Sequence, residues 1–99
     1  MAKISYSKRA LADLERLSDC LAPAGRATQL EALDLISEAI DILARHPLMG
    51  RPAEAGLREL VISQGKTGYI ALYVYEPVRD AVLVFSIRHQ REARFPSRV

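Results

Sequence analysis

Residues 67–89 read TGYIALYVYEPVRDAVLVFSIRH, and this segment organises the rest of the chain. The β-branched and aromatic residues of 69–75 and of 81–89 suit a pleated, half-buried surface, so both runs are predicted strands. Residues 76–80 are predicted to connect them, because Pro77 cannot donate a ladder hydrogen bond in a central strand. The segment is therefore predicted to form an antiparallel hairpin.

Apolar residues occupy consecutive positions in both predicted strands, not alternate ones. This pattern is typical of strands that are covered on both faces. Helices elsewhere in the chain can cover one face of the sheet. If a partner covers the other face, that contact is part of the function.

Two helices are predicted upstream of the hairpin. Leucines at spacings of three and four residues predict a helix over 8–21, with Ser7 as its N-cap. A wide apolar face predicts a second helix over 26–45, which ends before Pro47 because the residue before a proline avoids the α region. The Pro-Ala-Gly break at 23–25 joins the two as an antiparallel helical hairpin.

Two further strands complete the predicted sheet. Residues 2–6 alternate apolar and polar side chains, and LRELVI at 57–62 has the same two-residue period. The predicted fold class is α+β, in the order β-α-α-β-β-β. A three-stranded antiparallel meander and the N-terminal strand share one sheet, and the helical hairpin covers one of its faces.

Composition limits the class of protein. The chain has 99 residues and is expected to be one domain, 1–99, while an apolar share of 49% excludes a disordered chain. No apolar run approaches the roughly 20 residues of a membrane helix, so no membrane association is expected. No signal-peptide pattern follows Met1, which leads us to expect a cytoplasmic protein.

Metal and nucleotide chemistry find little support in the sequence. The single cysteine, Cys20, allows no internal disulfide and is predicted to be a small buried residue of the first helix. His46 and His89 have no ligand-spaced partner, so we expect no metal and no cofactor, and we interpret His46 as structural. The GKT at 65–67 resembles a phosphate loop, but its required first glycine is Leu60 here.

Positive charge gathers at the C-terminal end. The net charge is only +2, yet residues 88–99 carry four arginines against one glutamate. Such a patch attracts anionic partners, either nucleic acid or an acidic protein segment. The residues are Arg88, Arg91, Arg94 and Arg98 against Glu92.

One constellation could support chemistry, and two interpretations of it stay open. Arg58 on one predicted strand, with Arg88, His89 and Arg91 near the end of the last, could bind phosphate and transfer a proton, as RNA cleavage requires. The same residues could instead form an arginine-rich rim that binds an acidic partner. Residue spacing alone does not decide between the two, and we favour the second interpretation.

The order of motifs resembles the RelE/ParE superfamily, the toxin half of bacterial type II toxin–antitoxin pairs. The resemblance rests on KISYS, the helical hairpin, HPLMGRP, LRELVI, GYIALYVYEP and AVLVFSIRHQRE, in that order. It implies a toxin whose helical hairpin lies on an antiparallel sheet. It also implies a cognate ParD-like antitoxin whose C-terminal segment wraps the toxin, usually in an assembly of two toxins and two antitoxins. Operator DNA would be bound only through the antitoxin.

The superfamily divides by mechanism, and the sequence departs from its nuclease branch. RelE-like members cut mRNA on the ribosome, whereas ParE-like members block DNA gyrase. The nucleases usually carry an arginine shortly after the tyrosine of the GY strand and a late tyrosine or histidine for proton transfer. Here Ile70 follows Tyr69, and no tyrosine follows Tyr75, although Arg88 and His89 persist. Without the phosphate clamp such catalysis loses its main electrostatic contribution, which favours the ParE-like branch.

Three functional hypotheses follow from the resemblance. The first is a gyrase inhibitor that acts by binding and is not an enzyme. The second is a ribosome-dependent mRNA endonuclease in which Arg58 and Arg88 hold phosphate and His89 is the acid or base. The third is an interaction or regulatory module with the toxin fold.

Two sets of site residues are predicted. The target-binding set is Arg58, Arg88, His89, Arg91 and Arg94. The antitoxin-binding set is Leu11, Leu14, Leu35, Ile42, Tyr73 and Tyr75.

Overall fold

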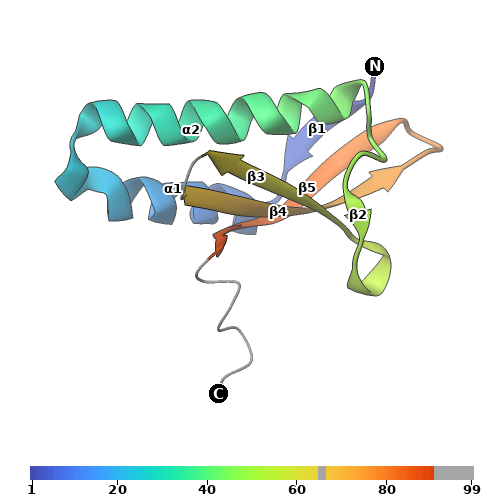
Figure 1. Cartoon of the computed structure of the whole chain (residues 1–99). Helices are drawn as coiled ribbons and strands as arrows, with labels where there is room; N and C mark the ends of the chain where they lie inside the picture. The colour runs from blue at the N-terminus through green and yellow to red at the C-terminus, as the bar shows by residue number, and fades with distance from the viewer. Residues whose placement is uncertain (65–66, 91–99) are drawn as a thin grey trace.

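The computed structural model describes residues 1–64 and 67–90, in which two helices pack on one face of a five-stranded sheet (Figure 1). The strand order in the sheet is β1-β5-β4-β3-β2. The elements are β1 (Lys3–Tyr6), α1 (Lys8–Leu21), α2 (Arg26–Asp41), β2 (Arg51–Pro52), β3 (Arg58–Gln64), β4 (Thr67–Glu76) and β5 (Ala81–His89). Within these ranges no helix is long and apolar enough to cross a membrane.

The predicted α+β class and its order of helices and main strands are confirmed, with three differences of detail. A two-residue strand, β2, adds an edge to the sheet where only a turn was predicted; it is too short to show a period, and an edge strand tolerates Pro52. The second helix ends at Asp41 and continues as a 3₁₀ turn over Ile42–Ala44. The strand predicted at 57–62 covers Arg58–Gln64.

The sheet combines an antiparallel meander with one parallel strand. β3 pairs with β4 and β4 with β5 in antiparallel fashion, whereas β1 lies parallel to β5 with Ile4 beside Val82. The chain reaches this parallel position because the helical hairpin and the meander separate β1 from β5. Residues that pair across the strands share a face, so the register tells which side chains meet the helices.

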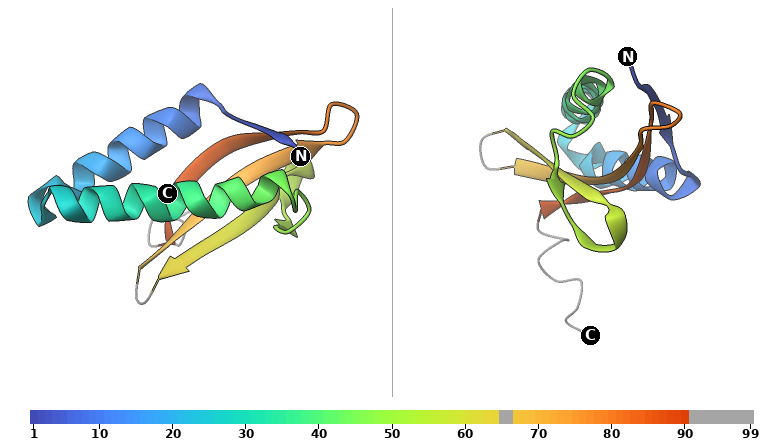
Figure 2. Two further views of the ribbon diagram at one scale, coloured as in Figure 1. Left: turned by 90° about the horizontal axis from the view of Figure 1, so that it is seen from above. Right: turned by 90° about the vertical axis from the view of Figure 1, so that its right-hand side faces the viewer.

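The core lies between the helices and one face of the sheet. Ala10 and Leu17 of α1 and Ile36 and Ile40 of α2 are buried against this face, as is Tyr73 of β4. Figure 2 shows that the turn between the helices extends past the end of the sheet. The prediction that Cys20 is buried is therefore wrong: it lies in the last turn of α1, near this projecting end, and its side chain is exposed.

The other face of the sheet is open within the described part of the chain. Val61, Leu83 and Phe85 are each about two-fifths exposed there, at 42%, 39% and 40%. By contrast Val82 and Val84, on the helix-covered face, are fully buried. The consecutive apolar residues of β4 and β5 thus have one face covered by the chain itself and a second face that the described residues leave uncovered.

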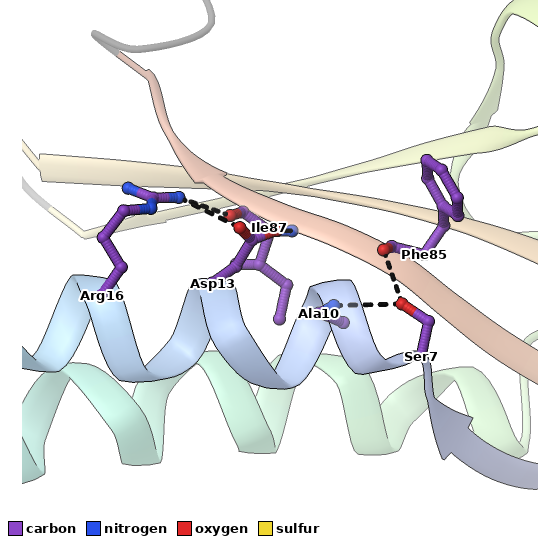
Figure 3. A network of polar contacts seen from close by, with 6 residues as sticks. All are labelled: Ser7, Ala10, Asp13, Arg16, Phe85 and Ile87. Carbon is purple, nitrogen blue, oxygen red and sulfur yellow. Dashed lines mark hydrogen bonds and ion pairs between the residues drawn. The ribbon is translucent and has the colours of Figure 1, made fainter.

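A β-bulge interrupts the pairing of β4 with β5. Leu72 pairs with Ser86 and Tyr73 with Val84, which leaves Phe85 as an extra residue on β5. A bulge disrupts the ladder locally and leaves backbone groups without their strand partner. Here α1 lies along the edge of β5 just beyond the end of β1 (Figure 3), and it supplies partners for those groups.

Side chains of α1 complete the hydrogen bonds at the bulge (Figure 3). Ser7 caps α1 as predicted: its Oγ accepts from the Ala10 amide at 3.0 Å and also donates to the Phe85 carbonyl at 2.8 Å. The amide of Ile87 donates to Oδ2 of Asp13 at 2.9 Å. Arg16 donates to Oδ1 of Asp13 at 3.3 Å and to the carbonyl of Ile87 at 3.5 Å. The first helix therefore holds the end of β5 in place by polar contacts as well as by packing.

Candidate functional site

The open face of the sheet holds a pocket with Arg88 on its rim. In the register, Arg88 pairs with Ile70, and Leu72 pairs with Glu59, so these four side chains share the open face. The segment between β2 and β3 forms the opposite wall of a pocket of about 530 Å³. The lining residues are Pro52, Ala53, Glu54, Leu57, Glu59, Ile70, Leu72 and Arg88.

The bulge is what places Arg88 on this face. Val82 and Val84 face the helices, and strict alternation from them would carry residues 86 and 88 to the covered face as well. Because Phe85 is an extra residue, Ile87 faces the core, where it is fully buried, and Arg88 faces outward. The network of Ser7, Asp13 and Ile87 therefore supports the orientation of Arg88 indirectly.

The acidic residue Glu59 of the pocket is bonded to Arg51, so it leaves Arg88 available to bind an anionic group of a partner. Glu59 is paired with Arg51, whose Nε and Nη2 both lie 2.7 Å from Oε1. Across the part of the chain that the structure describes, the guanidinium of Arg88 has no ion pair or hydrogen bond. A half-buried guanidinium above apolar Ile70 and Leu72 can bind a carboxylate or a phosphate of a partner that also has apolar groups.

Arg58 lies on the opposite face and has a structural task. It pairs with Tyr73 across β3 and β4, and its Nη1 donates to the carbonyls of Gly50 at 2.7 Å and Leu48 at 3.3 Å. The hydroxyl of Tyr73 donates to the Pro47 carbonyl at 2.8 Å and accepts from the Gly50 amide at 2.8 Å. Together the two side chains fasten residues 47–50, the loop that follows α2.

His89 lies on the covered face of the sheet, opposite to Arg88. It pairs with Tyr69, and the two rings pack edge to face with centroids 5.4 Å apart. Tyr69 and Tyr73 are four residues apart on β4, so His89 and Arg58 lie about 13 Å apart along the sheet. The structure thus keeps Arg58, Arg88 and His89 apart: two are on the covered face at different heights and one is on the open face. The remaining predicted target-binding residues, Arg91 and Arg94, lie outside the described residues.

Two of the predicted antitoxin-binding residues line a groove between the helices. Leu11, which is 55% exposed, and Leu14 project from α1 toward α2. The groove has a volume of about 470 Å³ and mainly apolar walls. It is lined by Tyr6, Leu11, Leu14, Glu15, Ser18, Leu33, Ile36 and Ser37. Burial, together with the nearby carboxylate of Asp41, raises the pKa of the Tyr6 hydroxyl above its ordinary value of 10.0.

Two others, Ile42 and Tyr75, belong to a second apolar pocket of about 540 Å³. Leu48 and Met49, which were not among the predicted binding residues, form its outer wall and are 59% and 56% exposed. The only sequence feature that could have indicated their exposure is the presence of two large apolar residues in the connection between Pro47 and Pro52. The lining residues are Ile42, His46, Pro47, Leu48, Met49 and Tyr75. The hydroxyl of Tyr75 donates to Asp80 at 2.8 Å, and this hydrogen bond raises the pKa of Tyr75.

Four of the predicted antitoxin-binding residues are thus divided between two separate pockets, and another, Tyr73, is not on the surface. Ile42, which directly follows α2, faces away from Leu33 and Ser37, because at about 100° per residue it is rotated from them by about 180° and about 140°. Leu35 is half-buried and packs against the core. Tyr73 is fully buried, so its prediction as a contact residue is wrong: an all-apolar strand does not reveal which of its residues face inward.

Metal-based chemistry has no visible centre in residues 1–64 and 67–90. No group of three or more His, Cys, Asp or Glu side chains in these ranges could hold a metal ion.

Comparisons with known proteins agree with the fold described above. The family model described as "ParE toxin of type II toxin-antitoxin system, parDE" matches residues 4–94. The chain is 35% identical over 94 residues to Toxin RelE3 of Caulobacter vibrioides, a match that covers 95% of this chain and 100% of that protein.

Solved structures of toxin–antitoxin complexes share the fold. A chain of the chromosomal ParDE system from P. aeruginosa superposes with a TM-score of 0.72 at 23% identity, covering 89% of this chain and 95% of that one. The RelBE2 complex from Mycobacterium tuberculosis gives a TM-score of 0.62 at 24% identity, covering 89% and 96%. A chain of the intact E. coli RelBE complex gives 0.63 at 13% identity, covering 89% and 95%.

Proposed function

Because this chain belongs to the ParE toxin family of type II toxin–antitoxin systems, we propose that it inhibits DNA gyrase by binding and is neutralised by a ParD-like antitoxin. The target-binding surface in this proposal is the open face of the sheet around Arg88; Arg91 and Arg94, which lie outside the described residues, stay in the predicted target-binding set. Arg58 contributes by holding the loop at 47–50 and not by contact with the target.

The observation that carries the proposal is the separation of the predicted catalytic residues. Cleavage of RNA requires a phosphate clamp and an acid or base within hydrogen-bond reach of the same bond. Arg58 and Arg88 lie on opposite faces of the sheet, and the Arg58 guanidinium is already bonded to two carbonyls. Ile70, beside Arg88, offers an apolar surface and no charge for a phosphate. This arrangement favours binding to a protein target over catalysis.

The test is supercoiling by purified gyrase in the presence of the full-length toxin. We expect inhibition of supercoiling, or accumulation of cleaved DNA, and a loss of about tenfold or more with Arg88→Glu. Arg26→Glu is a matched charge reversal at an exposed position at the start of α2, and it is expected to leave inhibition unchanged. A toxin that neither inhibits supercoiling nor raises cleaved DNA would refute gyrase as the target.

A second candidate, ribosome-dependent mRNA cleavage, is favoured by one observation. Arg88 has no ion pair within the described residues and could hold a phosphate, with His89 next to it in sequence. Cleavage of ribosome-bound mRNA at defined positions by the wild-type toxin, absent in His89→Ala, would displace the gyrase proposal. The two assays together separate the mechanisms, because only one predicts new RNA ends.

The antitoxin is proposed to bind apolar surface on the helical layer and to neutralise the toxin in an assembly of two toxins and two antitoxins. Support comes from the two apolar pockets beside α2, where Leu11, Ile42, Leu48 and Met49 are about half exposed. We propose that operator DNA is bound by the antitoxin and not by the toxin. Light scattering on the complex with the protein encoded next to this gene gives the stoichiometry. A one-to-one complex would overturn that part of the proposal.

A further inference from the structure

Apolar side chains continue along the open face of the sheet beyond the pocket at the end of β5. Leu83 and Phe85 of β5 and Val61 of β3 are each about two-fifths exposed. Val74 pairs with Leu83 and is half-buried beside it. Ile70 pairs with Val61 in the same way. These side chains form a contiguous apolar surface that the described residues leave uncovered, and such a surface is typical of a site that binds a partner.

A second arginine, Arg9, reaches this surface from the first turn of α1. Its guanidinium carbon lies 5.5 Å from the centre of the Phe85 ring, within the range of a cation–π contact. Figure 3 shows that the Phe85 ring projects from β5 on the side away from the helices. Stacking uses the flat face of a guanidinium and leaves the N–H groups at its edge able to donate. Within residues 1–64 and 67–90, Arg9 has no ion pair and no hydrogen bond.

Arg9 and Arg88 mark two separate positions along β5. Phe85, which Arg9 contacts, is three residues before Arg88, and three residues of a strand span about 10 Å. Arg88 lines the pocket that also contains Leu72, whereas Arg9 comes from the side of α1. A partner that pairs with both arginines therefore has two anionic groups about 10 Å or more apart, with apolar groups between them.

The charges on the open face favour an acidic partner. Glu59 is paired with Arg51 at 2.7 Å, so its charge is already compensated. Glu54, at the rim of the pocket, has no ion pair within the described residues. This single carboxylate is outnumbered by the guanidinium groups of Arg9 and Arg88. The surface is therefore apolar with an excess of positive charge, and it is complementary to a partner of opposite charge.

The apolar content of this surface favours a protein over a nucleic acid. A nucleic-acid strand carries a phosphate on every nucleotide, so proteins that bind it present rows of cations. Here two arginines stand beside apolar side chains, on which further phosphates would lose hydration without gaining a charge partner. A carboxylate next to an apolar side chain satisfies the arginines and the apolar surface together.

We infer that the protein target binds the open face with a segment that is both acidic and apolar. One carboxylate of this segment pairs with Arg88 and another with Arg9. The apolar side chains between the two carboxylates pack on Phe85 and Leu72. This inference rests on the proposed inhibition of gyrase, and it adds the chemistry of the target segment and a further contact residue, Arg9.

The first experiment measures the binding of full-length toxin variants to purified gyrase with its DNA. Arg9→Glu is expected to weaken binding about tenfold or more, because it places a like charge beside a carboxylate of the target. Lys8→Glu is the matched control, with the same change of charge in the same helical turn. Lys8 is three residues before Leu11, so it faces the groove between the helices and should change affinity less than threefold. Thermal unfolding of each variant shows whether it folds.

The second experiment identifies what lies on the open face. A photo-crosslinking amino acid replaces Leu83, which is exposed two residues before Phe85. The toxin is irradiated with gyrase and DNA, and mass spectrometry identifies the crosslinked molecule. We expect a gyrase peptide that contains at least two aspartates or glutamates beside apolar residues. A crosslink to DNA, or to a peptide without acidic residues, overturns the inference.

The outcomes separate this inference from the proposed function. Inhibition of supercoiling with equal effects of Arg9→Glu and Lys8→Glu overturns the contact at Arg9 and leaves gyrase as the target. Absence of both binding and inhibition overturns the proposed function and the inference together. Weaker binding of Arg9→Glu alone, with an acidic crosslinked peptide, is the result that supports the inference.

Discussion

The hydrogen bond between Asp13 and the Ile87 amide offers the most direct test of how α1 stabilises the sheet. Ile87 is fully buried, and its amide donates to Asp13 at the edge of β5, beyond Val84, where the pairing with β1 ends. Asp13→Ala leaves that amide without an acceptor, at a cost of about 1–3 kcal/mol. Loss of the partly exposed Asp13–Arg16 pair adds about 0–1 kcal/mol, and the higher helix propensity of alanine offsets about 0.5 kcal/mol.

We therefore expect Asp13→Ala to lower the free energy of unfolding by about 2 kcal/mol and the Tm by about 10 °C. Asp13→Asn keeps an oxygen that can accept from Ile87, and should lose only about 1 kcal/mol. Asp19→Ala, on the exposed side of the same helix, is the control and should change stability by less than about 0.5 kcal/mol. Urea unfolding gives the energies, and exchange of the Ile87 amide reports the local site.

Two results would refute this reasoning. If Asp13→Ala and Asp19→Ala have the same stability, the contact contributes nothing net. If Asp13→Ala is destabilised but exchange of the Ile87 amide is no faster than expected from global unfolding, the loss does not arise at the bulge. A double-mutant cycle with Arg16→Ala separates the ion pair from the backbone hydrogen bond.

The loop after α2 and the tyrosines provide further predictions. Gly50→Ala should destabilise by about 1–3 kcal/mol, because a Cβ there would lie 2.7 Å from the Tyr73 ring and 2.8 Å from a backbone carbonyl; thermal unfolding measures it. Tyr73→Phe removes the side-chain partner of the Gly50 amide and of the Pro47 carbonyl and should cost about 1–3 kcal/mol. Tyr75→Phe removes an exposed hydroxyl and should be nearly neutral in urea unfolding. The raised pKa of Tyr6 means that folding favours its protonated form, so its contribution is present below pH 10 and lost as the pH rises through the folded-state pKa. Tyr6→Phe should flatten the alkaline fall in unfolding free energy; an unchanged slope would contradict this.

The elements were well predicted where local signals agree. α1 covers Lys8–Leu21 and β5 covers Ala81–His89, both as expected, because a cap, leucine spacing and strand-forming residues all point the same way. β2 was missed because two residues cannot show a period. Cys20 was wrongly predicted to be buried. The spacing of apolar residues indicates which side of a helix faces the core, but it does not show how far along the helix the sheet extends.

The sites were predicted less well, because residues of the right kind need not face the same way. Arg58 on β3 and Arg88 on β5 belong to the same antiparallel meander, yet their side chains lie on opposite faces of the sheet. Leu48 and Met49 carried no periodic signal, since their exposure depends on how Tyr73 and Arg58 hold the loop from inside. Such tertiary contacts are not visible in local sequence patterns.

The bulge shows why one unpredicted residue matters for function. Without the bulge, the alternation of side chains along β5 would place Arg88 on the buried face with Val82 and Val84. An unpaired guanidinium there would cost several kcal/mol. The extra residue, Phe85, reverses the alternation and brings Arg88 to the open face. Backbone groups at the bulge and just beyond it need hydrogen-bond partners, and Ser7, the N-cap of α1, and Asp13 supply two of them. The residues that decide how the proposed target surface is presented are therefore in the first helix, more than 70 positions away from Arg88 along the chain.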